Sequence, residues 1–346
     1  MGRMSHSQSK VYFSFLALAA GITTQAQITL PVRGFGALEN TGINSPVIVR
    51  DVSIDRHGGL AFLLGERTAP DSPPWIVSGR LEGGRVLPNQ RIRTTSAIHG
   101  GLSHAPTGDF LTLEKATVSR SDRKLTFRTF AQDGRILSEA VADDQIAAFT
   151  PAESGVSWLS VDGTLHHRSA PGRSIAIPLI QDRSGFPSST ILRGSVSLVT
   201  LNKEEVAVVE RYNGRVHVAN VTTGRTRHSV LQAESLNQAT ATYAEMEERA
   251  KRELRPATTF TRATPALSTT ADPQGNLYTL ISPLNARTGA TVIQTDSDGR
   301  LQRTLRLPVN LFSSERFGPS YLRHTGSELY LISHDGKVAA YSLREK

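Results

Sequence analysis

Four arginines, one aspartate and one histidine stand at corresponding places in a sequence that repeats roughly every 50 residues, each near the expected start of a β-strand. They are Arg50, Asp51, His99, Arg193, Arg262 and Arg316. Guanidinium groups bind carboxylates and phosphates because their planar N–H donors match those anions. If the repeats form a ring, these residues would make a cationic mouth that binds an anionic ligand. The alternative interpretation is a set of solvated loop charges.

Patterns typical of catalysis or metal binding are not found. The sequence contains no cysteine, which excludes disulfides, thiolate nucleophiles and cysteine–zinc sites. It also lacks the G-x-S-x-G motif of serine hydrolases. His166 and His167 are adjacent on an expected strand and so point to opposite faces, and no evident carboxylate accompanies His99 and His104. Asp296–Gly299 lacks the further acidic ligands of a calcium loop and is predicted to be a hairpin turn. The sequence therefore predicts no catalytic residue, no metal site and no cofactor.

The charge balance is basic but dispersed. The chain has 346 residues and a formal net charge of +8. Nucleic-acid binding would require a clustered stripe of Lys and Arg, and none is present, so no nucleic-acid partner is predicted. Net charge acts first on solubility, which leaves an anionic small molecule or an anionic cell-envelope polymer as the partners that the charge favours.

The first 26 residues have the three parts of a secretory signal peptide in the usual order. Arg3 and Lys10 form a basic start, Val11–Ile22 is mainly apolar, and Thr24-Gln25-Ala26 is a small-x-small cleavage pattern. The apolar run is shorter than the ~20 residues of a transmembrane helix, and no other stretch approaches that length. We therefore expect export, cleavage near Ala26, and a periplasmic or secreted protein without a membrane span.

The rest of the chain carries a turn-and-strand marker at near-constant spacing. The first apolar residues of the marker strands are Leu60, Phe110, Val156, Val206, Leu277 and Leu329. Their spacings are 50, 46, 50, 71 and 52 residues. A second marker, a Gly-Arg turn, falls between them at Gly84, Gly134, Gly172, Gly224 and Gly299. Each unit then contains four short alternating strands joined by hairpins, which is the blade of a propeller.

The two ends of the chain are predicted to meet in one blade. The sixth unit has three expected strands, 320–323, 328–332 and 337–343, and then the chain ends. Residues 27–33, QITLPVR, resemble the fourth strand of the fifth unit. We expect them to supply the missing strand, which would remove an open sheet edge. Residues 27–346 would then form one domain, an all-β, six-bladed β-propeller.

The blade pattern resembles six-bladed propellers of the NHL-repeat and TolB-like kind over residues 27–346. The resemblance rests on the xxDxxGxLYxL form at Asp55–Leu64 and Asp272–Leu280. It implies that the site lies on the face carrying the connections between the second and third strands. Propellers host enzymes, binding modules and scaffolds, so the fold alone assigns no function. Lactonase-type propellers hold calcium with Glu, Asn and Asp, and no Glu or Asn stands at the predicted mouth.

One insertion, residues 231–255, accounts for the long spacing. Ser235 and Gln238 form a capping-box pattern, and Pro256 ends the run. An apolar stripe at helical spacing comprises Leu236, Ala239, Tyr243, Met246, Ala250 and Leu254. The segment is predicted to be a helix between two blades, either packed on the blade edges or available to a protein partner.

Together these observations favour an exported ligand-binding or partner-binding propeller without catalytic activity. The alternative is a propeller hydrolase or lyase acting at the channel mouth. A convergence of carboxylates and a histidine with perturbed pKa values would favour the enzyme, whereas a mouth lined by arginines would favour binding.

Overall fold

The computed structural model describes residues 27–344 apart from residues 70, 97, 106, 116–124, 143–144, 154, 170–171, 185, 187–190, 192–193, 254–263, 283–289 and 309–318. The predicted signal peptide and its cleavage position lie outside the described residues. Within the described part of the chain, no helix is long and apolar enough to cross a membrane.

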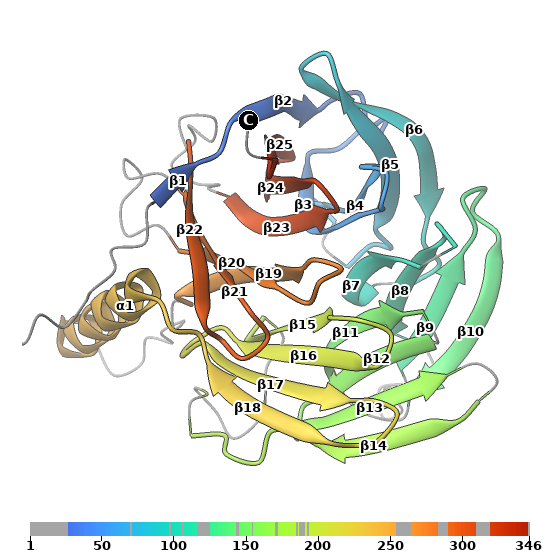
Figure 1. The fold of residues 1–346 in the computed structure, drawn as a ribbon. Helices are drawn as coiled ribbons and strands as arrows, with labels where there is room; N and C mark the ends of the chain where they lie inside the picture. The colour runs from blue at the N-terminus through green and yellow to red at the C-terminus, as the bar shows by residue number, and fades with distance from the viewer. Residues whose placement is uncertain are drawn as a thin grey trace, which may run out of the picture.

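The described strands form six blades around a central axis, as predicted (Figure 1). Blade 1 contains β3 (Val47–Ile54), β4 (Leu60–Glu66), β5 (Trp75–Glu82) and β6 (Arg85–Arg93). Blade 2 contains β7 (Ile98–His104), β8 (Phe110–Lys115), β9 (Leu125–Phe130) and β10 (Ile136–Ala142). Blade 3 contains β11 (Ile146–Ala152), β12 (Gly155–Ser160), β13 (Thr164–Ser169) and β14 (Ser174–Pro178).

The other three blades follow the same order from the axis outward. Blade 4 contains β15 (Val196–Thr200), β16 (Glu205–Glu210), β17 (Arg215–Asn220) and β18 (Thr226–Val230). Blade 5 contains β19 (Ala266–Ala271), β20 (Leu277–Ile281), β21 (Ala290–Thr295) and β22 (Leu301–Leu307). Blade 6 contains β23 (Pro319–Thr325), β24 (Glu328–Ser333), β25 (Lys337–Ser342) and β2 (Val32–Leu38). The predicted marker strands are the second strands of all six blades.

The second strands are apolar on both sides because each blade packs between two others. Phe62 and Leu63 are consecutive in β4 and both are buried. Phe62 belongs to a core cluster with Ile332 of blade 6, whereas Leu63 belongs to one with Leu102 of blade 2. Successive side chains of a strand point to opposite faces, so a strand buried on both faces needs a continuous apolar run.

The Gly-Arg turns connect the third and fourth strands, as expected. In the last of them, Asp296 Oδ1 accepts hydrogen bonds from the backbone N–H groups of Asp298 and Arg300. Gly299 has φ = 79°, a conformation that glycine adopts without a steric penalty. The segment 296–299 is therefore a hairpin turn, as the sequence predicted.

The chain ends close the ring as predicted, but the closing strand lies further along the chain. Blade 6 is completed by β2, which pairs antiparallel with β25. Of the predicted residues 27–33, only Val32 and Arg33 belong to β2. Within that range, β1 (Gln27–Thr29) instead pairs parallel with β22 as an extra outer strand of blade 5. Pro31 lies between the two strands and has no N–H to donate. β2 also pairs with β6 over two residues, which joins blade 6 to blade 1.

The inserted helix α1 (Glu234–Glu253) joins β18 to β19, as predicted. It begins at Glu234, so Ser235 lies inside its first turn. Leu236 and Ala239 of the predicted apolar stripe are buried, whereas Met246 is 57% exposed. Because strands alternate in direction within a blade, this connection lies on the same face as the turns between second and third strands. We call this the upper face.

We predict that the closing strand is sensitive to the size of its central residue. An added Cβ at Gly36 would lie 2.8 Å from the backbone N of Arg85 and 2.7 Å from Leu81. Gly36→Ala should therefore lower the free energy of unfolding by about 1–3 kcal/mol, as overpacking does. Urea denaturation measures this.

Gly34→Ala is the matched control, because its Cβ would meet only the side chain of Leu81, at 3.1 Å. Its effect should be smaller. Equal effects of the two substitutions would contradict the close contact of β2 with the β5–β6 turn.

Candidate functional site

The inner strands of the six blades enclose a cavity of about 770 Å³ on the propeller axis. Each inner strand contacts the next in the order β3, β7, β11, β15, β19 and β23, and β23 closes the ring on β3. The size is within the range of cavities that hold small-molecule ligands. This channel is the candidate site.

Register shifts near the start of the inner strands change which side chains face the channel. The shift in β3 lies between Val49 and Asp51, so Arg50 is the extra residue of a bulge. A bulge re-aims neighbouring side chains, and as a result the consecutive residues Arg50 and Asp51 both line the cavity. Similar shifts occur in β7, β11, β19 and β23. The Arg50 guanidinium packs over Gly65, where an added Cβ would lie 2.1 Å from Nε.

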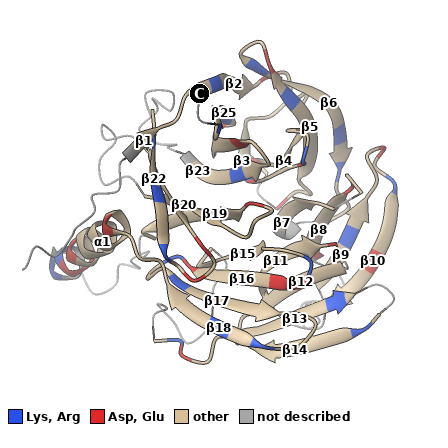
Figure 2. Ribbon diagram, viewed as in Figure 1, with Lys and Arg blue, Asp and Glu red and all other residues tan. Residues whose placement is uncertain are grey.

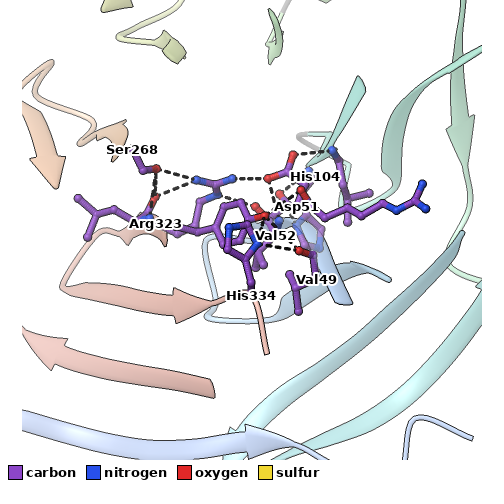
Figure 3. A network of polar contacts seen from close by, with 12 residues as sticks. Val49, Asp51, Val52, His104, Ser268, Arg323 and His334 are labelled. Carbon is purple, nitrogen blue, oxygen red and sulfur yellow. Dashed lines mark hydrogen bonds and ion pairs between the residues drawn. The ribbon is translucent and has the colours of Figure 1, made fainter. Parts of the chain in front are cut away.

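Asp51 joins three blades through its carboxylate (Figure 3). Oδ1 accepts hydrogen bonds from the backbone N–H of Val52 and from Arg323 Nη2, both at 2.8 Å. Oδ2 accepts from the backbone N–H of Leu102 in blade 2 at 2.9 Å. Gly101 makes room for this carboxylate, since a Cβ there would lie 2.3 Å from Oδ2. The carboxylate is thus engaged by one guanidinium and two backbone amides.

Arg323 extends the same network to blade 5. Its Nε donates to the carbonyl of Val52 at 2.5 Å, and its Nη1 donates to the carbonyl of Leu322 at 2.9 Å. Ser268 of blade 5 lies 3.4 Å from Nη1 and accepts a hydrogen bond from the backbone N–H of Leu322 (Figure 3). Blades 5, 6, 1 and 2 are therefore linked around the axis by polar contacts.

Tyr321 and His334 add further contacts between blades 6 and 1. The Tyr321 hydroxyl donates to the carbonyl of Arg50 at 2.9 Å. His334 Nδ1 lies 3.0 Å from the carbonyl of Val49 and donates to it (Figure 3). Burial, followed by the charge of Asp51, raises the pKa of Tyr321, so this phenol is neutral and remains a donor.

Arg211 brings a second guanidinium to the upper part of the channel. It follows β16 in the turn to β17 and lines the cavity. Its Nε donates to the carbonyl of Ala266 at 2.9 Å, and its Nη2 lies 3.5 Å from the hydroxyl of Thr264. Both partners are neutral, and burial lowers the pKa of the guanidinium. No carboxylate among the described residues forms an ion pair with Arg211.

Two histidines occupy partly buried positions near the other end of the inner strands. His104 contacts Ser53 through Nδ1 at 2.9 Å, and His324 stacks on Tyr278 with ring centroids 5.1 Å apart. Burial lowers the pKa of both histidines, while Asp55 and Asp272 respectively oppose that shift. Burial also lowers the pKa of His167 in blade 3. In each case the folded protein favours the neutral imidazole.

The six predicted mouth residues have different outcomes. Arg50 and Asp51 line the channel. His99 belongs to β7, and its side chain is not among those described. Arg193, Arg262 and Arg316 lie outside the described residues. A role in ligand binding stays a prediction for all six.

The channel is also lined by four residues that the sequence did not predict: Arg211, Tyr321, Arg323 and His334. Arg323 lies within a first strand and Arg211 in a turn, whereas the predicted mouth residues stand near the starts of first strands. An arginine within a predicted first strand was the available signal for Arg323. Nothing in the sequence marked Arg211, because its position depends on how blade 4 meets blade 5.

Other polar clusters lie within single blades. In blade 4, Glu210 Oε1 contacts His217 Nε2 at 2.6 Å, and His217 Nδ1 lies 2.9 Å from His228 Nδ1. His166 stacks on Trp158, while His167 contacts Ser157 on the opposite face, as expected for strand neighbours. Within the described residues, no group of three or more acidic, histidine or cysteine side chains is arranged to hold a metal ion.

No model of a known protein family matches the chain, and no curated protein matches it. Solved structures do resemble it. One is a catalytically inactive virginiamycin B lyase from Staphylococcus aureus with quinupristin, at 11% identity and a TM-score of 0.51, covering 90% of this chain and all of that one. Another is BamB from Moraxella catarrhalis, at 14% identity and a TM-score of 0.41, covering 86% and 85%. At 11% identity, the similarity to the lyase shows the β-propeller fold alone.

We predict that the ion pair of Asp51 and Arg323 holds the ring together at the axis. Asp51→Ala should lower the free energy of unfolding by about 2–4 kcal/mol, because it leaves a partly buried guanidinium without its carboxylate. In the double variant with Arg323→Met, the loss should be smaller than the sum of the two single losses. Urea denaturation of the four proteins measures the coupling.

Glu153→Ala is the control, since Glu153 pairs with Lys203 on the surface and surface pairs contribute little. It should leave the unfolding midpoint unchanged. Strict additivity of the Asp51 and Arg323 substitutions would rule out the proposed coupling.

The histidines whose pKa values are lowered predict a loss of stability on mild acidification. A histidine whose pKa is lowered in the folded state binds protons more weakly there than in the unfolded chain. The contribution of such a histidine to the free energy of unfolding is therefore complete at pH values above its ordinary pKa of 6.5. It is lost as the pH falls below that value. The free energy of unfolding should be lower at pH 5.5 than at pH 8.

His324→Phe keeps the ring contact with Tyr278 and removes one titrating group, so it should flatten this pH dependence. His57→Gln, at an exposed position, should not change it. A pH profile that His324→Phe leaves unaltered would show that this imidazole is not responsible.

Proposed function

We propose that the protein is an exported β-propeller that binds a small anionic ligand in its central channel and does not catalyse a reaction. The observation that carries the proposal is Arg211. Its guanidinium lies in the cavity wall and meets two neutral acceptors. A charge kept from bulk water without a counter-charge is costly. An anion bound in the channel would offset that cost.

The carboxylate of Asp51 does not serve as that counter-charge. Its two oxygens are engaged by Arg323 and by the N–H groups of Val52 and Leu102. Arg50 adds a further positive charge to the wall. Guanidinium groups suit carboxylate and phosphate because they can donate two parallel hydrogen bonds. The predicted mouth residues Arg193, Arg262 and Arg316 belong to the same proposal.

The described lining supports binding over the hydrolase or lyase alternative. General acid–base catalysis commonly uses two titratable groups whose pKa values are pushed apart. Among the described lining residues, Asp51 is the one carboxylate, and it is held by Arg323. No specific contact favours the alternative.

Export and partner docking remain parts of the proposal. Export is supported by the signal-peptide pattern of residues 1–26. On α1, the exposed Met246 supports the second possibility raised by the sequence, a protein partner that docks on the helix.

The proposal predicts anion binding that depends on Arg211. Calorimetric titration of residues 27–346 with inorganic phosphate at low ionic strength should show saturable binding. Arg211→Gln should weaken it about tenfold or more, because a hydrogen bond to a charged group contributes about 1.5–3 kcal/mol.

Arg173→Gln is the matched control, since Arg173 is exposed in an outer turn, and it should bind phosphate like the unaltered chain. Far-ultraviolet circular dichroism must show the same fold for both variants. Equal phosphate affinity in the Arg211 and Arg173 variants would overturn the proposal.

A further inference from the structure

The charged residues of the inner strands are confined to one side of the channel. β3 contributes Arg50 and Asp51, and β23 contributes Arg323. By contrast, β11, β15 and β19 contain no Lys, Arg, Asp or Glu (Figure 2). In a ring of six blades, blade 3 lies across the axis from blade 6, and blade 4 lies across from blade 1. At the level of the inner strands, the channel therefore has a charged wall opposite an uncharged one. Arg211 of blade 4 lies above the uncharged wall, in the turn between β16 and β17.

The uncharged wall presents apolar side chains to the cavity between the hydroxyl groups of Ser and Thr residues, among them Thr150, Ser197 and Thr270. Ala148 and Phe149 of blade 3, Val199 of blade 4 and Leu267 of blade 5 all line it and are only partly buried. Phe149 is held by an edge contact with Phe127, at 5.6 Å between ring centroids. When a ligand covers apolar surface that is open to a confined cavity, the free energy of the complex is lowered.

The charge of the residues that line the channel also changes along its axis. Arg211 lies in a turn on the upper face, and Arg50 lies near the start of β3, which is at the same end. Further down, the lining is Ile54, Thr270, Ala271 and His324, and no Lys, Arg, Asp or Glu is among the described lining residues there. A ligand that enters from the upper face would meet positive charge first and the uncharged wall beyond it.

We propose that the ligand is an amphipathic organic anion, with a carboxylate or phosphate head near Arg211 and an alkyl or aryl body against Phe149 and Val199. This inference rests on the proposed function and specifies its ligand class. A fully polar anion such as a sugar phosphate would leave the apolar wall wet. A neutral apolar ligand would leave Arg211 without a counter-charge.

A series of carboxylates with bodies of increasing length tests the inference. Acetate, butyrate, hexanoate and octanoate are titrated into residues 27–346 at constant ionic strength, with 1-octanol as the neutral probe. Affinity should rise about threefold to fourfold for each methylene that becomes buried. Octanoate should bind at least about tenfold more tightly than 1-octanol, because only the carboxylate pairs with Arg211.

Substitutions in the uncharged wall distinguish the contribution of the ligand's apolar body to affinity from that of its anionic head. Phe149→Ala should weaken octanoate about tenfold and leave acetate unchanged. Val199→Thr changes the volume little and should weaken octanoate about threefold, which covers the case in which Phe149→Ala does not fold. Val230→Thr, on the exposed outer strand β18, is the control and should bind octanoate normally.

The outcomes distinguish this inference from the proposed function. If acetate and phosphate bind through Arg211 but affinity does not rise with chain length, the ligand class is wrong while anion binding stands. If 1-octanol binds as tightly as octanoate and Arg211→Gln has no effect, both proposals are wrong. If affinity rises with chain length and neither Val199→Thr nor Phe149→Ala changes that rise, the proposed placement of the apolar body is wrong.

Discussion

The carboxylate of Asp51 is the point where the ring is held together at its axis. It accepts hydrogen bonds from its own strand, from Leu102 in the following blade, and from Arg323 in the blade that closes the circle. Arg323 in turn reaches Ser268 of blade 5. These groups lie partly shielded from water, where an unpaired charge is costly. The network therefore favours one relative placement of these four blades. Packing of apolar faces specifies that placement less strictly, because the faces are similar from blade to blade.

The outer closure depends on a different constraint, the pairing of open sheet edges. β2 completes blade 6 and also touches β6, so it joins the first and last blades far from the axis. β1 covers the edge of blade 5. One segment near the start of the described chain thus covers exposed edges of three neighbouring blades. Unpaired edges would otherwise invite pairing with other chains.

The same ring constraint creates the channel and its chemistry. The inner strands are held apart by the blades behind them, so their side chains leave a cavity on the axis. Where bulges shift the register, consecutive residues such as Arg50 and Asp51 face that cavity. Asp51 is used to hold the ring, whereas Arg211 retains a charge without a carboxylate partner among the described residues. The charge that holds the ring and the charge that we propose meets a ligand therefore belong to different residues.

The sequence by itself determined the β-propeller, its second strands, its glycine turns and the position of α1, because these follow from local periodicity and turn chemistry. It also indicated Arg50 and Asp51 as channel residues through their place in the repeat. It placed the closing strand too early in the chain, since only Val32 and Arg33 of the predicted residues 27–33 belong to β2. Only the assembled ring shows which sheet edge β1 and β2 each meet. Arg211 and Arg323 were missed because their partners lie in other blades, more than 50 residues away in the case of Ala266 and 272 residues away in the case of Asp51. Contacts between residues so distant in the chain are decided by tertiary packing, which no local pattern encodes.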